Sequence, residues 1–230
     1  PTFTIMILAG TSRIRFRALG GKRNFLIMKT EYYDLNGKKL GIPVPESYSD
    51  CMTLIKSDRF RLTGKTESSF PIILRNLRPF GHHTRWLFWL RLSSYKGVFH
   101  PFCRFMYGIT SRRAQVQIPP FSKIGYGLYT GHGICIIINE GTVIGNNVNI
   151  SQLLNIGTNH CTPAIIGDNV YIAPHVSIVE DVKIGSNSSV GAGAVVTKDV
   201  PENATVAGVP ARVLNYNHPG RYIGRRYPCE

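Results

Sequence analysis

An aliphatic residue recurs at every sixth position through much of the second half of the chain. Ile or Val keeps this spacing without interruption from residue 166 to residue 196, and an earlier run ends at residue 156. The positions are Ile144, Ile150, Ile156, Ile166, Ile172, Ile178, Ile184, Val190 and Val196. The residue after each is mostly small, and Ile118 and Ile124 show the same spacing upstream. Six consecutive positions in phase argue against a chance alignment in an ordinary β-rich domain.

A repeat of six matches neither the period of two of a half-buried strand nor the period of 3.6 of a helix. It fits a three-sided coil, in which each unit forms one flat side and points its aliphatic residue into a narrow prism. The small neighbour lets the chain turn the corner without a Cβ clash. Three units close a coil of about eighteen residues, and stacked coils pair their strands in parallel. The sequence therefore predicts a parallel β-helix over residues 117–215.

Residues 48–116 are predicted to form an α-helical cap on the N-terminal end of this prism. Apolar residues recur there at helical spacing, including Met52, Ile55, Phe60, Trp86, Trp89 and Leu90. A repeat array needs a cap because its terminal coil exposes an apolar surface. Two or three helices are expected.

The two ends of the chain are predicted to lie outside these units. Residues 1–47 form an irregular N-terminal extension, in which residues 1–27 contain no acid and carry no clear periodicity. Residues 1–27 read as an upstream extension, with an Arg-rich targeting peptide as the alternative. Residues 216–230 are polar, and a flexible tail is expected there.

The formal charge of +14 lies entirely in the first half of the chain. Residues 1–116 contain 20 Lys and Arg against 6 Asp and Glu, whereas residues 117–230 contain 7 against 7. A basic half favours an anionic neighbour, yet no nucleic-acid-binding motif accompanies it. We therefore expect no nucleic-acid partner and a solvated basic face that can associate peripherally with a membrane.

Two further features bear on location. The longest apolar run, Trp86–Leu90, is far shorter than the roughly 18 residues that span a bilayer. The five cysteines are dispersed without a CxxC pair, which fits a reducing compartment better than a disulfide framework. A cytoplasmic protein is therefore expected.

The segment IGDNVYIAPHVSIVEDVKIGSNSSVGAGAVVTKDVPENATVAGVPARVL resembles the left-handed β-helix acyltransferases. Its ending, AGVPARV after a VxxDVP segment, is a specific signature. The resemblance is to the serine acetyltransferases and to the sugar O-acetyltransferases of surface-polysaccharide pathways. It covers residues 117–215 and implies an all-β, left-handed parallel β-helix that uses acetyl-CoA. The handedness comes from the resemblance alone, since spacing does not set it.

His132, in GLYTGHGICIIINEG, is the candidate general base. By resemblance this stretch aligns with the segment that carries the catalytic histidine of serine acetyltransferases. A hydroxyl attacks a thioester at neutral pH only if a base of near-neutral pKa removes its proton, and histidine fits that role. Gly131 and Gly133 leave room beside the ring. The alternative is a structural histidine hydrogen-bonded between coils.

A second histidine lies where the repeat is interrupted. Four extra residues separate Ile156 from Ile166, so the chain must leave the coil there, and such a loop is often a binding loop. His160 in this loop is a substrate-binding partner of His132 or a rival base, with a passive surface histidine as the alternative. The His160–Cys161 pair lacks two further ligands at a suitable spacing, and no metal is expected. His175 is expected to face outward.

Two departures from the family bear on the acceptor. Gln117 stands where serine acetyltransferases have an aspartate that orients the histidine, and an amide cannot stabilise an imidazolium by charge. The family's substrate-binding histidine would fall at Thr162 or Pro163. Gln117 is therefore assigned to acceptor binding, and serine becomes the second choice of acceptor. Glu140 is an alternative carboxylate.

Acetyl-CoA is the donor that the resemblance implies, held in a groove along the corners of successive coils. The matching positions are Ala173, Ser189, Gly191, Ala192, Ala207 and Gly208, with Lys198 and Arg212 as partners of the nucleotide phosphates. For the small residues, corner geometry alone is the alternative explanation. In this family a neighbouring subunit supplies the second wall of the groove, so a homotrimer is expected.

The sequence thus predicts an acetyl-CoA-dependent O-acetyltransferase that acts on a sugar hydroxyl in surface-polysaccharide synthesis. Serine O-acetylation for cysteine synthesis is the alternative within the same chemistry. The rivals from other classes are a non-catalytic β-helix scaffold, a metal-dependent trimer of the carbonic-anhydrase kind, and a basic nucleic-acid-binding module.

Overall fold

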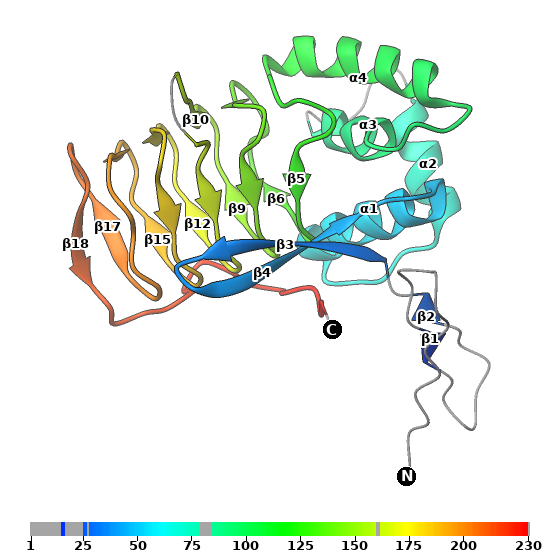
Figure 1. Ribbon diagram of the computed structural model, residues 1–230. Helices are drawn as coiled ribbons and strands as arrows, with labels where there is room; N and C mark the ends of the chain where they lie inside the picture. Colours follow the sequence, from blue (N-terminus) through cyan, green and yellow to red (C-terminus); the bar gives the residue numbers. More distant parts are fainter. Residues whose placement is uncertain (1–14, 17–24, 27, 79–83, 160–161, 230) are drawn as a thin grey trace.

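Figure 1 shows a computed structural model in which a stack of short strands is closed at one end by helices. It describes residues 15–16, 25–26, 28–78, 84–159 and 162–229. The strands from β5 to β17 build a prism, and α1 to α4 lie at the end where the first coil begins. None of the helices within these residues is long and apolar enough to cross a membrane.

The prism has three sides, each a parallel sheet that takes one strand from every coil. Side A contains β5 (Lys123–Ile124), β8 (Val143–Ile144), β11 (Ile165–Ile166) and β14 (Lys183–Ile184). Side B contains β6 (Tyr129–Thr130), β9 (Asn149–Ile150), β12 (Tyr171–Ile172), β15 (Ser189–Val190) and β17 (Thr205–Ala207), followed by the antiparallel β18 (Arg212–Asn215). Side C contains β7 (Ile137–Ile138), β10 (Asn155–Ile156), β13 (Ser177–Ile178) and β16 (Val195–Val196). The chain visits the sides in the order A, B, C.

The repeated aliphatic residues fill the interior of this prism, as the sequence predicted. On side A, Ile144 pairs with Ile166 and Ile166 with Ile184, and all three are fully buried. The register is the same on the other sides, where Ile172 pairs with Val190 and Ile156 with Ile178. Burying each such side chain contributes roughly 1.5–3 kcal/mol. The stack of aliphatic layers is therefore the main stabilising feature of the second half of the chain.

The corner between sides A and B requires glycine. A Cβ added at Gly145 would lie 2.6 Å from the backbone of Gly167 in the next coil, and Gly125 stands in the same relation to Gly145. These distances are too short for any side chain. The small residue after each repeat position is thus a packing requirement at this corner.

The cap contains four helices: α1 (Tyr48–Thr63), α2 (Ser69–Leu77), α3 (Arg85–Ser93) and α4 (His100–Ala114). The sequence predicted two or three. Helix α1 begins where Ser47 Oγ accepts a hydrogen bond from Asp50 N at 3.1 Å, and ends at Gly64 in the left-handed region. Helix α3 is buried along almost its whole length, so it is the core of the cap.

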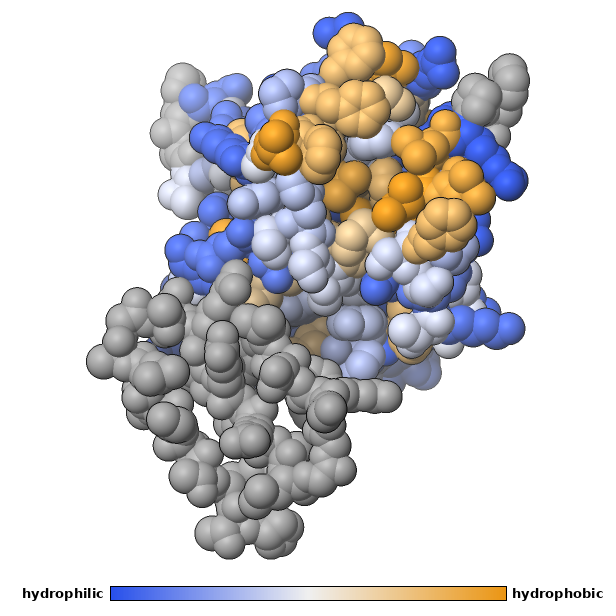
Figure 2. All heavy atoms as spheres, turned by 90° about the vertical axis from the view of Figure 1, so that its right-hand side faces the viewer, coloured by the Kyte–Doolittle hydropathy of each residue, from blue (hydrophilic) through white to orange (hydrophobic). Residues whose placement is uncertain are grey.

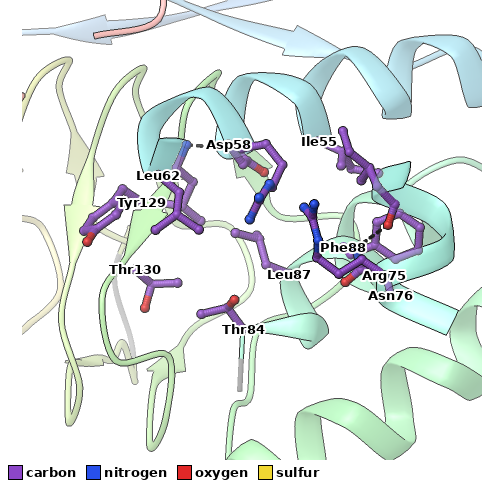
Figure 3. A pocket seen from close by; sticks show the side chains of 13 residues that line it. Ile55, Asp58, Leu62, Arg75, Asn76, Thr84, Leu87, Phe88, Tyr129 and Thr130 are labelled. Carbon is purple, nitrogen blue, oxygen red and sulfur yellow. Dashed lines mark hydrogen bonds between the residues drawn. The ribbon is translucent and has the colours of Figure 1, made fainter. Parts of the chain in front are cut away.

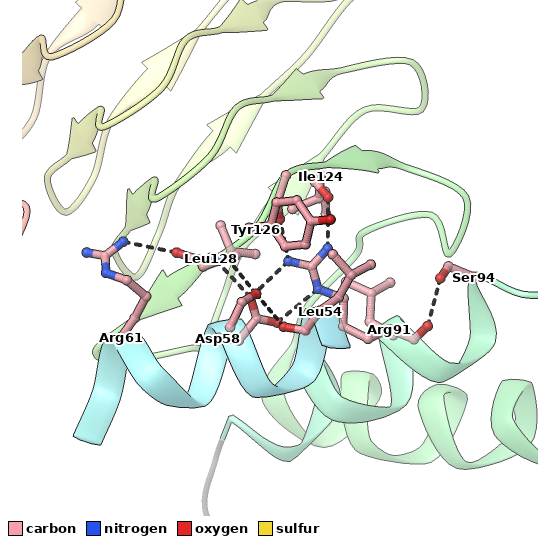
Figure 4. A network of polar contacts seen from close by, with 12 residues as sticks. Leu54, Asp58, Arg61, Arg91, Ser94, Ile124, Tyr126 and Leu128 are labelled. Atoms are coloured by element: carbon pink, nitrogen blue, oxygen red, sulfur yellow. Dashed lines mark hydrogen bonds and ion pairs between the residues drawn. The ribbon is translucent and has the colours of Figure 1, made fainter. Parts of the chain in front are cut away.

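A buried ion pair joins the cap to the first coil (Figure 4). Asp58 on α1 binds Arg91 on α3 through two hydrogen bonds of 2.9 Å, and the Leu128 N–H donates to Asp58 at 2.8 Å. Arg91 also donates to the carbonyls of Ile124 and Gly125. Burial raises the pKa of the Asp58 carboxyl, and the charge and hydrogen bonds of Arg91 oppose that rise. The pair fixes the orientation of the helices on the prism.

Part of the segment predicted to be irregular is a β-hairpin. Strands β3 (Lys29–Leu35) and β4 (Lys38–Val44) pair along their full length, so the prediction is wrong for residues 29–44. The signal was present, because Asn36-Gly37 between two strand-like runs favours a tight hairpin turn, and both residues have positive φ. The hairpin packs Leu40 and Ile42 against Val143 of side A. Upstream, β1 (Arg15–Phe16) and β2 (Phe25–Leu26) form a short antiparallel pair.

The predicted flexible tail is instead an ordered strap, which we define as residues 217–229. It returns from the last coils toward the cap, where Gly220 N donates to Asn187 O and Tyr227 N donates to Asn147 Oδ1 at 2.7 Å. Its Tyr222 ring lies 4.6 Å from that of Tyr171. Asparagine side chains that project from the coils thus hold a segment whose sequence looks merely polar.

Candidate functional site

The loop that carries His132 is a local departure from the prism. Successive repeat positions on sides B and C are six residues apart in the later coils, but Thr130 and Ile138 are eight apart. The two extra residues let the chain bulge outward, and the imidazole of His132 is exposed. A hydrogen bond of 2.9 Å from Ile134 N to His132 O closes the bulge. The sequence showed the histidine but not this insertion.

Trp86 of α3 holds this loop against the cap. The indole is fully buried, and its Nε1 donates a hydrogen bond of 2.7 Å to Gly133 O. A Cβ added at Gly133 would lie 2.9 Å from the same nitrogen. Gly133 is therefore small so that the tryptophan can reach its carbonyl. Sequence reasoning placed Trp86 on a helix but missed this role.

A column of small residues follows the corner between sides B and C and ends beside His132. We call it the B–C column. It has one member in each coil. Gly131, Ser151, Ala173 and Gly191 come immediately after the side B strand, and Ala207 is the last residue of β17, in register with Gly191. Three predicted cofactor-binding residues, Ala173, Gly191 and Ala207, are thereby brought into one line.

The members of the B–C column are small for different reasons. A Cβ added at Gly191 would lie 2.9 Å from the Cβ of Ala207, so packing restricts that position. At Gly131 the nearest atoms would be those of Tyr129, at 3.7 and 3.8 Å, and the backbone has no positive φ. These are ordinary van der Waals distances, so among the described residues neither packing nor backbone geometry requires glycine at residue 131. The small residue next to the histidine is therefore a candidate feature of the site.

The remaining predicted cofactor-binding residues lie at the far end of the same side. Ser189 is buried on β15, and Ala192 is exposed after it. Gly208 follows β17 with a φ of 98°, and its carbonyl accepts from Val195 N at 3.1 Å. Two exposed cations are also found there, Lys198 after β16 and Arg212 at the start of β18.

The other candidate residues are placed as follows. Gln117 is exposed, and its backbone pairs with β7 by hydrogen bonds of 2.8 Å to Ile136 O and 2.9 Å from Ile138 N. His160 lies outside the described residues. Its loop is anchored on both flanks, since Asn159 N donates to Glu180 and Thr162 N donates to Asp181. His175 is exposed, as expected, and Glu140 is exposed in the turn after β7.

A cavity of about 120 Å³ lies between the cap and the first coil (Figure 3). Its walls come from α1, α2, the start of α3, and β6. Thr130, two residues before His132, contributes a hydroxyl that is buried and has no hydrogen-bond partner among the described residues. Arg59 and Arg75 also line the cavity, and both bind Glu67, at 2.9 and 3.1 Å. An unsatisfied hydroxyl and two guanidinium groups next to the loop make this cavity a candidate acceptor pocket.

Across residues 28–78, 84–159 and 162–229, no group of three His, Cys, Asp or Glu is placed to hold an ion. The described cysteines Cys51, Cys103, Cys135 and Cys229 are free thiols.

Comparison with known proteins adds a family and a fold. The family described as bacterial transferase hexapeptide (six repeats) matches residues 163–198. The serine acetyltransferase of Staphylococcus epidermidis is 32% identical over 151 residues, which are 64% of this chain and 70% of the relative.

Two solved structures share the architecture. A serine acetyltransferase in complex with CoA has a TM-score of 0.55 and 27% identity, over 72% of this chain and 68% of the other. The Neisseria gonorrhoeae serine acetyltransferase in complex with serine has a TM-score of 0.56 and 28% identity, over 73% and 69%. The predicted fold, a left-handed parallel β-helix preceded by an α-helical cap, is confirmed.

Proposed function

This chain belongs to the hexapeptide-repeat serine acetyltransferase family, and on that premise we propose that it transfers acetyl from acetyl-CoA to the hydroxyl of a small acceptor. The observation that carries the proposal is the exposed His132 at the end of the B–C column, beside a glycine that packing does not require. Serine is the first acceptor to consider.

The comparisons favour serine over the sugar hydroxyl that the sequence put first. The similar proteins are named serine acetyltransferases, and one was solved with serine bound. The size of the cavity points the same way, because a cavity of about 150 Å³ in another protein holds benzene. At about 120 Å³, this cavity suits a small amino acid better than a hexose. A sugar remains the second candidate because Gln117 stands where serine acetyltransferases have an aspartate, and its amide cannot stabilise an imidazolium at His132 by charge.

The residues fit an acetyl-CoA molecule laid along the B–C column. Bound acetyl-CoA supplies an acyl thioester. Small side chains at Ala173, Gly191 and Ala207 let a narrow chain approach the backbone, with Ser189, Ala192 and Gly208 beside them. Lys198 and Arg212 supply the positive charge that nucleotide phosphates need.

His132 then acts as general base. One imidazole nitrogen takes the proton of the acceptor hydroxyl while that oxygen bonds to the thioester carbonyl carbon. The carbon–sulfur bond breaks, and the imidazolium returns the proton to the sulfur. The products are the acetyl ester and free CoA. In this proposal Gln117 and His160 contact the acceptor.

We also infer a homotrimer, because the column is open on one side. Three apolar side chains near His132 are unusually exposed: Ile134 at 42%, Ile137 at 44% and Leu153 at 42%. A neighbouring subunit placed there would cover them and close the groove.

The test is release of free CoA by the full chain with serine and with a panel of sugars. Transfer to serine is expected, and His132→Ala should lower kcat at least a hundredfold, the ordinary contribution of a general base. His218→Ala, at an exposed histidine of the strap, is the control and should change nothing. Full turnover by His132→Ala with loss in His160→Ala would overturn the assignment of the base.

A further inference from the structure

Helix α4 exposes its large apolar side chains and buries mostly small or polar ones, which is the opposite of an ordinary surface helix. Its buried face carries Cys103, Tyr107, Thr110, Ser111 and Ala114, which are mostly small or polar. Its solvent face carries phenylalanines, with Phe102 52% exposed and Phe105 66% exposed, and Phe99 before the helix is 62% exposed. A surface helix normally turns its apolar stripe toward the core. The orientation of α4 therefore leaves its largest apolar side chains in water.

Helix α2 extends this surface. Phe70 is 74% exposed, and Leu74 and Leu77 follow on the same face, whereas Ile72 on the opposite face is fully buried. The apolar helical face is defined as Phe70, Ile73, Leu74, Leu77, Val98, Phe99, Phe102 and Phe105. Figure 2 shows apolar side chains gathered in the upper part of the side of the molecule where the helices lie. Clusters of this kind mark interaction sites.

The region around the apolar helical face is strongly positively charged, which favours an anionic partner. Residues 68–139 contain nine Lys and Arg and no Asp or Glu. The exposed cations are Arg75, Arg78, Lys96, Arg104, Arg112 and Arg113. Arg75 binds Glu67, but no acid among the described residues pairs with the other five. Arg104 is exposed on α4 and lies next to Phe105 in the sequence, so positive charge flanks the exposed phenylalanines.

We propose that the apolar helical face binds the surface of a membrane that contains anionic lipids. The phenylalanines and leucines enter the boundary between headgroups and acyl chains, and the cations stay at the level of the lipid phosphates. A second copy of the chain is a poor occupant, because it would bring two acid-free, positively charged surfaces together. The proposal does not depend on the identity of the acceptor.

The experiment is co-sedimentation of the full chain with vesicles. One set contains phosphatidylcholine alone, and the other contains phosphatidylcholine with phosphatidylglycerol. Binding is expected to the second set only, and to weaken as salt is raised. Replacing Phe102 or Phe105 by Ser should weaken binding roughly tenfold each, and Arg104→Gln about fivefold. Tyr32→Ser removes an aromatic that is 67% exposed on the hairpin and should leave binding unchanged.

Three results would overturn the proposal: no binding to either set, equal binding to both, or equal loss with Tyr32→Ser. A lower oligomeric mass of Phe102→Ser/Phe105→Ser by light scattering, without vesicle binding by the unmodified chain, would assign the face to a second copy. Circular dichroism and acetyl transfer in solution show whether each variant is folded. Both should be unchanged for Phe105→Ser, which is 66% exposed, whereas Phe102→Ser also loses a ring contact with Trp89 at 5.7 Å.

Discussion

Gly131 and Gly133 flank the same histidine but are small for different reasons. A Cβ at Gly131 would make an ordinary van der Waals contact with Tyr129 at 3.7 Å, whereas one at Gly133 would lie only 2.9 Å from the Trp86 indole nitrogen. Gly133 is therefore required by packing against Trp86, whereas Gly131 is not required by the packing of the described residues. The sequence shows the two glycines as equivalent, because nothing in GHG reveals that a tryptophan lies against one of them.

The first prediction exploits this contrast. Gly131→Ala should leave the melting temperature unchanged, since the added methyl makes only ordinary contacts with Tyr129, and raise KM for acetyl-CoA about tenfold or more, because the methyl lies beside His132 where the acyl chain is proposed to bind. Gly133→Ala should cost about 1–3 kcal/mol of stability, the usual range for an overpacked position. Thermal denaturation and steady-state kinetics measure both. Equal destabilisation of the two variants would contradict the role given to Gly131.

Trp86 and Trp89 provide a second matched pair. Both indoles are buried on α3, but Trp86 Nε1 donates to Gly133 O, whereas Trp89 Nε1 has no hydrogen-bond partner among the described residues. Trp86→Phe should leave a buried carbonyl unsatisfied, cost about 1–3 kcal/mol, and lower kcat by loosening the His132 loop. Trp89→Phe removes a similar volume but no hydrogen bond, so kcat should be unchanged. A loss of kcat in both variants would assign the effect to packing alone.

These residues show what the sequence could supply for the site. Most of the small corner residues stand in a regular repeat, so their positions could be predicted from spacing, whereas His132 was singled out by family resemblance and its bulged loop was not predicted. The contact from Trp86 to Gly133 spans 47 residues and joins a helix to a bulged loop. Thr130 carries no signal in the sequence, because its importance arises from the burial of its hydroxyl.

Among the elements, the short strands were the most predictable and the strap the least. Each strand is only two residues long in most coils, but the interior position recurs so regularly that the repeat alone fixes the register. The hairpin β3–β4 had a usable signal in Asn36-Gly37. The strap had none, since its attachment depends on the side chains of Asn147 and Asn149 and on the carbonyl of Asn187, whose directions are known only once the coils are stacked.

The strap should stabilise the junction between cap and prism. Arg61 of α1 is buried and donates to Gly224 O of the strap, to Gly127 O of the first coil and to Asn149 Oδ1. Burial lowers the pKa of its guanidinium to about 10, and each carbonyl or amide oxygen offsets part of that cost. The strap therefore completes the shell of acceptors around a buried cation.

The third prediction follows from this arrangement. A chain that ends at Tyr216 loses the Gly224 acceptor and the rings that stack on Tyr126 and Tyr171. With about 1 kcal/mol for each hydrogen bond and about 0.5–1.5 for each ring pair, several kcal/mol of stability should be lost. Thermal denaturation measures the change. Tyr216→Ala, at an exposed ring just before the strap, is the control, and an unchanged melting temperature in the truncated chain would show that the strap is dispensable.

At the scale of the whole molecule, the helical cap contacts the His132 loop, lines the candidate acceptor pocket and carries the proposed membrane-binding face. Its α3 supplies Trp86 to the His132 loop, and its α1 and α2 form most of the candidate acceptor pocket. Its outward faces on α2 and α4 form the proposed membrane-binding surface. Because the Asp58–Arg91 pair and Arg61 tie the cap to the first coil, the proposed binding of this face to a membrane would also position the active site relative to that surface.

The last prediction concerns the assembly. The exposed Ile137 and Leu153 lie close to the His132 loop, where Leu153 N donates to Ile134 O at 3.4 Å. If a neighbouring subunit covers them, Ile137→Asp with Leu153→Asp should convert a trimer into monomers, since burying two carboxylates at an interface is strongly unfavourable. Acetyl transfer should be lost when the trimer dissociates, because the groove then lacks its second wall.

Analytical ultracentrifugation and CoA release follow the two effects in the same samples. Tyr32→Asp places a charge on an exposed residue of the hairpin and should affect neither. A monomeric variant that keeps full turnover would show that one chain holds a complete site.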